Sequence, residues 1–288
     1  MSYFAVAALE LTLLGLLAGL AGTLVVLRRR SFFAVALSHA TFPGGVVFAI
    51  AGWNLLLGQA VFALVLVLLM TLLGRIRGQG RQVTSGVVLS FGFALGTLLA
   101  SLNPDLGIPV EALLVGSPLS VAGSDVGATA AVLVLTLVVL AASWRRILFH
   151  TFDPVGFAAA GFRSWPVELI VTGVIAAAVV VAMPAVGAIL GVAVIIGPAA
   201  TARVLTDRLE WIPPIAAGIG VGGGLLGLWL SRELGIAAGG SVGLVLAGVF
   251  LLAVAVRAGT RAASRRRAEF ATVGDRNPAV EVKGAAQT

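Results

Sequence analysis

The sequence predicts an all-α polytopic membrane protein with about nine transmembrane helices, its N-terminus outside and its C-terminus in the cytoplasm. Hydrophobic residues make up 59% of the 288 residues and charged residues only 11%. The mean hydropathy of +1.10 is likewise typical of a chain that lies in lipid. Short arginine clusters separate apolar runs that are long enough to cross a hydrocarbon core of about 30 Å.

The first four apolar runs alternate in direction across the predicted membrane. Arg28, Arg29 and Arg30 directly follow the first run and mark the cytoplasmic side, because positively charged loops stay inside. The second run returns outward to a short turn at Trp53 and Asn54. The predicted spans are 5–27, 33–52, 55–73 and 84–101.

Five more spans follow a long outer connection at 103–124. Its apolar patch, 112–116, is too short to cross a bilayer, so we expect a re-entrant or surface turn there. The sixth and seventh spans are separated only by a tight turn containing Pro184, which predicts a helical hairpin. Of the 19 Lys and Arg residues, this topology places only Arg232 outside. The spans are 125–143, 167–183, 186–205, 211–230 and 241–256.

The chain thus divides into a transmembrane domain and a tail. The transmembrane domain covers residues 1–257 and includes a long internal loop at 147–166. Residues 258–288 are basic and then polar, and they predict a disordered cytoplasmic extension.

His39 is the most conspicuous polar residue in the apolar spans. An ionisable side chain in a span is costly unless it faces a cavity, a partner or a substrate, which favours a functional role. Pro43 and Gly44 predict an interruption of the helix just beyond it, and such interruptions occur where the backbone lines a cavity or a protein interface. The alternative is a packed histidine that donates one hydrogen bond to a neighbouring helix.

Glu10 lies in the first span and has two interpretations. It is either a hydrated residue near the outer interface or a second ligand that faces the pore. The sequence alone leaves both open.

The internal loop encodes a short surface helix. Asp153 can cap a helix whose first residue is Pro154, and Gly161 can end it. The exposed face of this helix is predicted to carry Phe157 and small alanines. A short amphipathic helix of this kind lies on lipid or docks into the groove of a partner.

Several functions are excluded by what the sequence lacks. No G-x-x-x-x-G-K-[ST] motif occurs, and the only lysine, Lys283, is in the tail, so the chain has no P-loop for ATP. There is no cysteine and no H-E-x-x-H motif, which argues against thiolate metal sites and zinc hydrolases. The net charge of +7 sets membrane orientation and does not indicate nucleic-acid binding.

Three ordered blocks carry a resemblance to a known family. The first is Val-Leu-Arg-Arg-Arg-Ser-Phe-Phe-Ala-Val-Ala-Leu-Ser-His-Ala-Thr-Phe-Pro-Gly at 26–44, the second is the Phe-Asp-Pro loop that begins at Phe152, and the third is Gly-Pro-Ala-Ala-Thr-Ala-Arg-Val-Leu-Thr-Asp-Arg-Leu at 197–209. The chain resembles the membrane subunit of zinc, manganese and iron ABC importers. The likeness covers about residues 5–257.

The resemblance implies a multi-pass permease of the plasma or inner membrane. Its expected partners are a cytoplasmic ABC ATPase that uses the ATP, an extracytoplasmic solute-binding protein and a second copy of the permease. The path would be lined by Ser38, His39, Pro43 and Gly44, with His39 as metal ligand and Glu10 as a weaker candidate. Residues Asp153, Pro154, Phe157 and Gly161 would belong to the helix that couples to the ATPase. The chain would bind no cofactor of its own and would carry the metal as cargo.

One position departs from the family pattern. The family's aspartate four residues before the histidine corresponds to Val35. That spacing places a carboxylate and an imidazole on one helix face toward one ion. Either another group such as Glu10 replaces it, or the path holds the ion more loosely, or the cargo is a metal chelate.

Two function classes compete with metal import by an ABC permease. An ion- or proton-coupled secondary carrier would need a relay of several acids or histidines in the spans, and apart from Glu10 and His39 the spans are nearly bare of them. A purely structural membrane subunit would leave His39 without a purpose.

Overall fold

The structure is a computed structural model, and it describes residues 3–73, 81–104 and 116–274. These residues form helices connected by turns, with no strand among them, which confirms the predicted all-α class. Among the described residues, eight helices are long and apolar enough to cross a membrane, with α2 and α3 counted as one. The elements are α1 (Tyr3–Leu27), α2 (Ser31–Ala40), α3 (Phe42–Ile50), α4 (Leu55–Leu73), α5 (Arg81–Ser101), η2 (Pro118–Ser120), α7 (Gly123–Phe152), α8 (Pro154–Ala159), α9 (Ser164–Leu205), η3 (Leu209–Trp211), α10 (Ile212–Leu234) and α11 (Ala238–Gly274).

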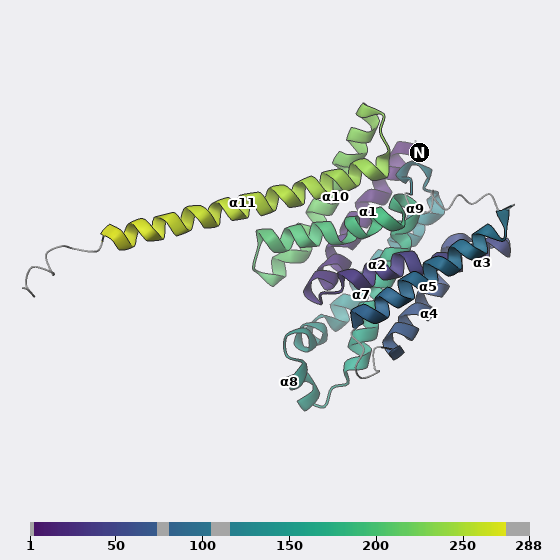
Figure 1. The fold of residues 1–288 in the computed structure, drawn as a ribbon, viewed down its shortest axis with the longest axis horizontal. Coiled ribbons are helices and arrows are strands. Elements are labelled where there is room, and N and C mark those ends of the chain that lie inside the picture. The colour runs from purple at the N-terminus through teal and green to yellow at the C-terminus, as the bar shows by residue number, and fades with distance from the viewer. Residues whose placement is uncertain (1–2, 74–80, 105–115, 275–288) are drawn as a thin grey trace, which may run out of the picture.

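Helices α1 and α9 form the centre of the bundle (Figure 1). α1 packs against α7, α9 and α10, and α9 also contacts α2, α4 and α11. The two helices supply much of the buried core, including Leu11, Leu17 and Ile175. By contrast, α4 and α5 keep many apolar side chains exposed, as expected for helices that face lipid or another membrane subunit.

Close contacts between backbones hold the bundle together. A Cβ added to Gly15 on α1 would lie 2.4 Å from the backbone nitrogen of Val221 on α10. A Cβ on Gly92 of α5 would lie 2.7 Å from the Cα atom of Ala40 on α2. Small residues allow this approach, and van der Waals packing then supplies the association energy that the hydrophobic effect cannot supply in lipid.

The backbone is interrupted at two places within the predicted spans. The second predicted span consists of α2 and α3, which meet at Thr41, with Pro43 in the first turn of α3. The sixth and seventh spans form the 42-residue α9, which has non-helical backbone at Gly187 (φ 70°, ψ 174°). The two parts of α9 run in different directions in Figure 1. Because the sixth and seventh predicted spans form one element, α9, the nine predicted spans correspond to eight potential membrane helices among the described residues.

The predicted turn at Pro184 is wrong in position. Pro184 lies within α9, and the break falls at Gly187. Proline fixes φ near the helical value, whereas the positive φ at the break is readily adopted only by glycine. The chain at 116–117 packs on this break: a Cβ on Gly116 would lie 2.1 Å from the Gly187 nitrogen, and the Ser117 N–H donates to the Pro184 carbonyl at 3.4 Å.

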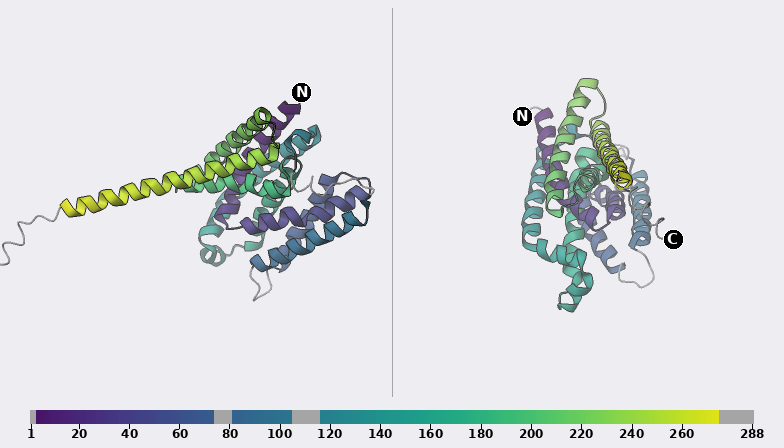
Figure 2. Two further views of the ribbon diagram at one scale, coloured as in Figure 1. Left: turned by 45° about the horizontal axis from the view of Figure 1, so that its top comes forward. Right: turned by 90° about the vertical axis from the view of Figure 1, so that its left-hand side faces the viewer.

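The tail differs from its prediction. α11 continues as a helix to Gly274 and projects beyond the rest of the bundle (Figures 1 and 2). The stretch 261–269 is rich in alanine and arginine, both strong helix formers, so local propensity extends the last span. The predicted disorder of 275–288 and the apolar patch at 112–115 lie outside the described residues.

We predict that Gly92→Ala lowers the melting temperature of the purified protein in detergent. The added methyl group collides with the backbone of α2, and overpacking of this kind costs about 1–3 kcal/mol. Gly127→Ala is the matched control, because a Cβ on this α7 glycine meets nothing within 4 Å. A Gly92→Ala protein that melts at or above the control would contradict the proposed close contact.

Candidate functional site

His39 lies on α2 beside α5. Its side chain is half-buried, and its ring stacks edge-on against Phe93 with centroids 6.1 Å apart and planes at 84°. Val35, one turn earlier on the same helix, is also half-buried. The imidazole therefore lies on a partly open face of the bundle, next to the position where the family pattern has a carboxylate.

The hydroxyl groups near His39 are used within the protein. The Ser38 hydroxyl donates to the Val35 carbonyl at 2.9 Å, a bond that stays within α2. The Thr41 hydroxyl lies 3.3 Å from the Ser38 carbonyl and 3.6 Å from the Met183 sulfur on α9. Ser38 and Thr41 are buried, so these groups support the interrupted helix and fix it against α9.

Pro43 and Gly44 place the start of α3 tightly against α4. Proline has no N–H with which to continue the backbone hydrogen bonds of α2, and its fixed φ suits the first turn of a new helix. A Cβ on Gly44 would lie 2.4 Å from the carbonyl oxygen of Gly58. The predicted interruption beyond His39 is confirmed, and its backbone is covered by α4 and α9.

Glu10 is placed elsewhere in the bundle. Its side chain is fully buried between α1 and α7, where the Thr129 hydroxyl donates to Oε1 at 2.7 Å. Its described contacts do not include His39. Within the described part of the chain, no group of three or more His, Cys, Asp or Glu side chains gathers where it could hold a metal ion. Of the two interpretations of Glu10, the hydrated position at the outer interface does not hold, because the side chain is fully buried. A role for Glu10 as a metal ligand stays a prediction.

The loop after α7 forms the predicted short helix, α8. The Gly156 N–H donates to Asp153 Oδ1 at 2.7 Å, Pro154 occupies the first turn, and Gly161 has φ 82° just beyond the end. The local pattern of cap, proline and glycine thus specified this helix correctly.

The orientation of Phe157 was predicted incorrectly. Its side chain is only 1% exposed, and its ring lies 5.4 Å from Phe149, 5.1 Å from His150 and 5.1 Å from Phe162. This aromatic cluster brings α8 back against the end of α7. The exposed apolar surface is formed instead by Val155, which is 79% exposed, together with Phe152 and Phe162.

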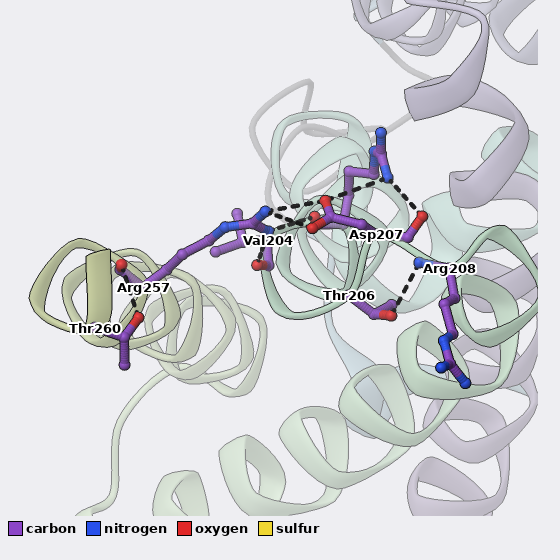
Figure 3. A network of polar contacts seen from close by, with 7 residues as sticks. Val204, Thr206, Asp207, Arg208, Arg257 and Thr260 are labelled. Atoms are coloured by element: carbon purple, nitrogen blue, oxygen red, sulfur yellow. Dashed lines mark hydrogen bonds and ion pairs between the residues drawn. The ribbon is translucent and has the colours of Figure 1, made fainter. Parts of the chain in front are cut away.

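Two groups of ion pairs were not predicted from the sequence. Glu168 on α9 accepts hydrogen bonds from Arg28 and Arg30 at the α1–α2 junction. Arg257 on α11 binds both carboxylate oxygens of Asp207, at 2.9 and 3.0 Å, and the carbonyl of Val204 at the end of α9 (Figure 3). The partners of each ion pair between different helices lie far apart in the sequence, so no local pattern predicts the pairing. The arginine clusters themselves are apparent in the sequence.

Comparison with known proteins gives consistent matches along most of the chain. A model of the ABC 3 transport family matches residues 1–257. The manganese transport system membrane protein MntC of Halalkalibacterium halodurans is 29% identical over 252 residues, which cover 88% of this chain and 86% of that protein. The zinc transport system membrane protein TroC of Treponema pallidum is 34% identical over 251 residues, covering 84% of each.

A solved structure shares the fold. PsaBC from Streptococcus pneumoniae, in complex with Fab, superposes with a TM-score of 0.78 and 27% identity. The match covers 88% of this chain and 91% of that chain. The helices are therefore arranged as in this solved structure over most of the chain.

We predict that Asp153→Ala loosens α8. Loss of an N-cap costs about 1 kcal/mol, so the amides of 155–161 should exchange with deuterium several-fold faster. Asp153→Asn keeps an acceptor at the cap and is the control. Equal exchange in Asp153→Ala and wild type would show that the aromatic cluster alone holds this helix.

Proposed function

The chain belongs to the ABC 3 transport family, and from this premise we propose that it forms the membrane path by which an ATP-driven importer takes up a divalent metal ion. As an ABC permease with eight potential membrane helices, it is a multi-pass protein of the cytoplasmic membrane. The observation that carries the proposal is the half-buried His39 on an interrupted helix. An ionisable group at such a place in a span favours a role in an ion pathway.

His39 acts in this proposal as a transient ligand of zinc or manganese. A neutral imidazole suits zinc and binds manganese or iron less tightly. A conduit has to release what it binds, so one imidazole from each of two subunits is a reasonable site. The related manganese and zinc transport proteins support a divalent metal as cargo.

A metal chelate is the second candidate cargo. It is favoured by Val35, which supplies no carboxylate beside His39. A chelated ion keeps its own ligands, so the path would need fewer. A solute-binding protein would deliver either cargo on the outer side.

The α8 helix couples this path to a separate ATPase. The surface formed by Phe152, Val155 and Phe162 is apolar and exposed, and it suits a groove on a cytoplasmic partner. Asp153, Pro154 and Gly161 define the ends of the helix, and buried Phe157 anchors it to α7. Movement of the partner would pass to α7 through this aromatic cluster.

We predict that His39→Ala abolishes metal uptake in cells that express the chain with its ATPase and binding protein. Radiolabelled zinc and manganese uptake is the measurement, with membrane abundance of each variant as the control. Glu10→Gln should retain uptake, because the amide preserves the buried contact with Thr129. Full uptake of both metals in His39→Ala would remove His39 from the path.

We predict that Val155→Glu uncouples transport from ATP hydrolysis without destabilising the permease. A charge on this exposed apolar surface opposes docking, since a partner's groove would have to desolvate it. Transport-stimulated ATP hydrolysis and uptake should both fall, while the melting temperature stays within a few degrees of wild type. Val155→Ile is the control that keeps the surface apolar. Normal coupling in Val155→Glu would place the ATPase contact elsewhere.

A further inference from the structure

A cavity of about 320 Å³ lies where α1 passes into α2, and α4, α5 and α9 complete its walls. It is separate from His39, which does not line it. Its lining includes Arg28, Arg29 and Arg30. A volume of this size accommodates a small ligand or a headgroup.

The lining carries an excess of positive charge. Three arginines face one carboxylate, Glu168, among the described lining residues. Glu168 contacts both Arg28 and Arg30, which holds their side chains in place; these are only 7% and 13% exposed. Arg29 is a third arginine in the lining of the same cavity.

The backbone adds to this positive potential. Three helices begin at the cavity: α2 at Ser31, α5 at Arg81 and α9 at Ser164. The N-terminus of a helix carries a partial positive charge and unpaired N–H groups, and it favours anions. Two helices reach the cavity by their C-terminal ends: α1, which ends at Leu27 just before Arg28, and α4, through Met70 and Thr71.

A buried hydroxyl group also lies in the wall of the cavity. Thr84, in the first turn of α5, lines the cavity and is only 6% exposed. Its Oγ1 atom has no hydrogen-bond partner among the described residues. A buried hydroxyl without a partner costs free energy, so a ligand with acceptor oxygens would satisfy it.

We propose that this cavity binds a phosphate group. The arginines bind its oxygens by charge-assisted hydrogen bonds, the three helix N-termini stabilise its charge, and the Thr84 hydroxyl donates to it. The phosphate can come from the headgroup of an anionic lipid or from free phosphate, because both present the same acceptor oxygens.

The test uses the full-length chain in detergent. Native mass spectrometry measures the dissociation constants of phosphatidylglycerol and phosphatidylcholine, and inorganic phosphate is added as a competitor. Arg29→Gln should weaken phosphatidylglycerol binding about tenfold, and Thr84→Val about fivefold, as expected for charged and neutral donors to an anion.

Matched controls keep the test specific. Arg208→Gln makes the same charge change on the α9–α10 connection, and Thr97→Val makes the same hydroxyl change further along α5, both outside the cavity lining. Both controls should bind within about twofold of wild type. Thr84→Val is nearly isosteric, so it reports on the cavity even if Arg29→Gln does not fold.

The outcomes separate the two sources of phosphate. Tight phosphatidylglycerol binding that inorganic phosphate does not displace assigns the cavity to a lipid headgroup. Displacement by inorganic phosphate assigns it to the free ion. The proposal is overturned if wild type binds neither probe, or if Arg29→Gln and Thr84→Val bind phosphatidylglycerol as tightly as the controls do.

Discussion

The fold depends on how the backbone is satisfied where helices break inside the bundle. In lipid, each unpaired N–H or C=O costs several kcal/mol, so an interruption is tolerated only under protein cover. Both interruptions are covered by protein, and the covering contacts lie close together on α9. Thr41, at the α2–α3 break, contacts Met183 on α9, one turn before the Gly187 break, and Ser117 donates to Pro184 beside it. The α2–α3 break is thus covered by α9, and the break in α9 is covered by the chain at 116–117.

The charged residues at helix ends follow a second constraint. Arginine clusters orient a membrane chain, but guanidinium groups that are partly buried need acceptors. Glu168 accepts from two of the arginines that follow α1, and Asp207 with the last carbonyls of α9 accepts from Arg257. These contacts tie α1 to α9 and α11 to α9. The same arginines therefore hold the central helix α9 to α1 and α11.

The sequence predicted well what local patterns determine. The apolar runs, the arginine clusters and the cap at Asp153 act through neighbouring residues, and the structure confirms the helices they predict. The sequence predicted poorly the features that depend on residues far away in the chain. The burial of Phe157 depends on α7, that of Glu10 on Thr129, and the break at Gly187 on the chain at 116–117. The residue pattern of one helix does not show which side chains of another helix will pack against it.

The surroundings of His39 bear on how the proposed path would hold a metal ion. A closed zinc site uses four ligands, but His39 is the single imidazole here, and the hydroxyls of Ser38 and Thr41 are directed to backbone carbonyls and a sulfur atom. Val35 adds no oxygen. One copy of the chain therefore presents an open, incomplete set of ligands, and water or a second copy would have to supply the others. Weak, shared coordination suits a step that passes the ion onward, because an ion held by one imidazole leaves more readily than one held by four ligands.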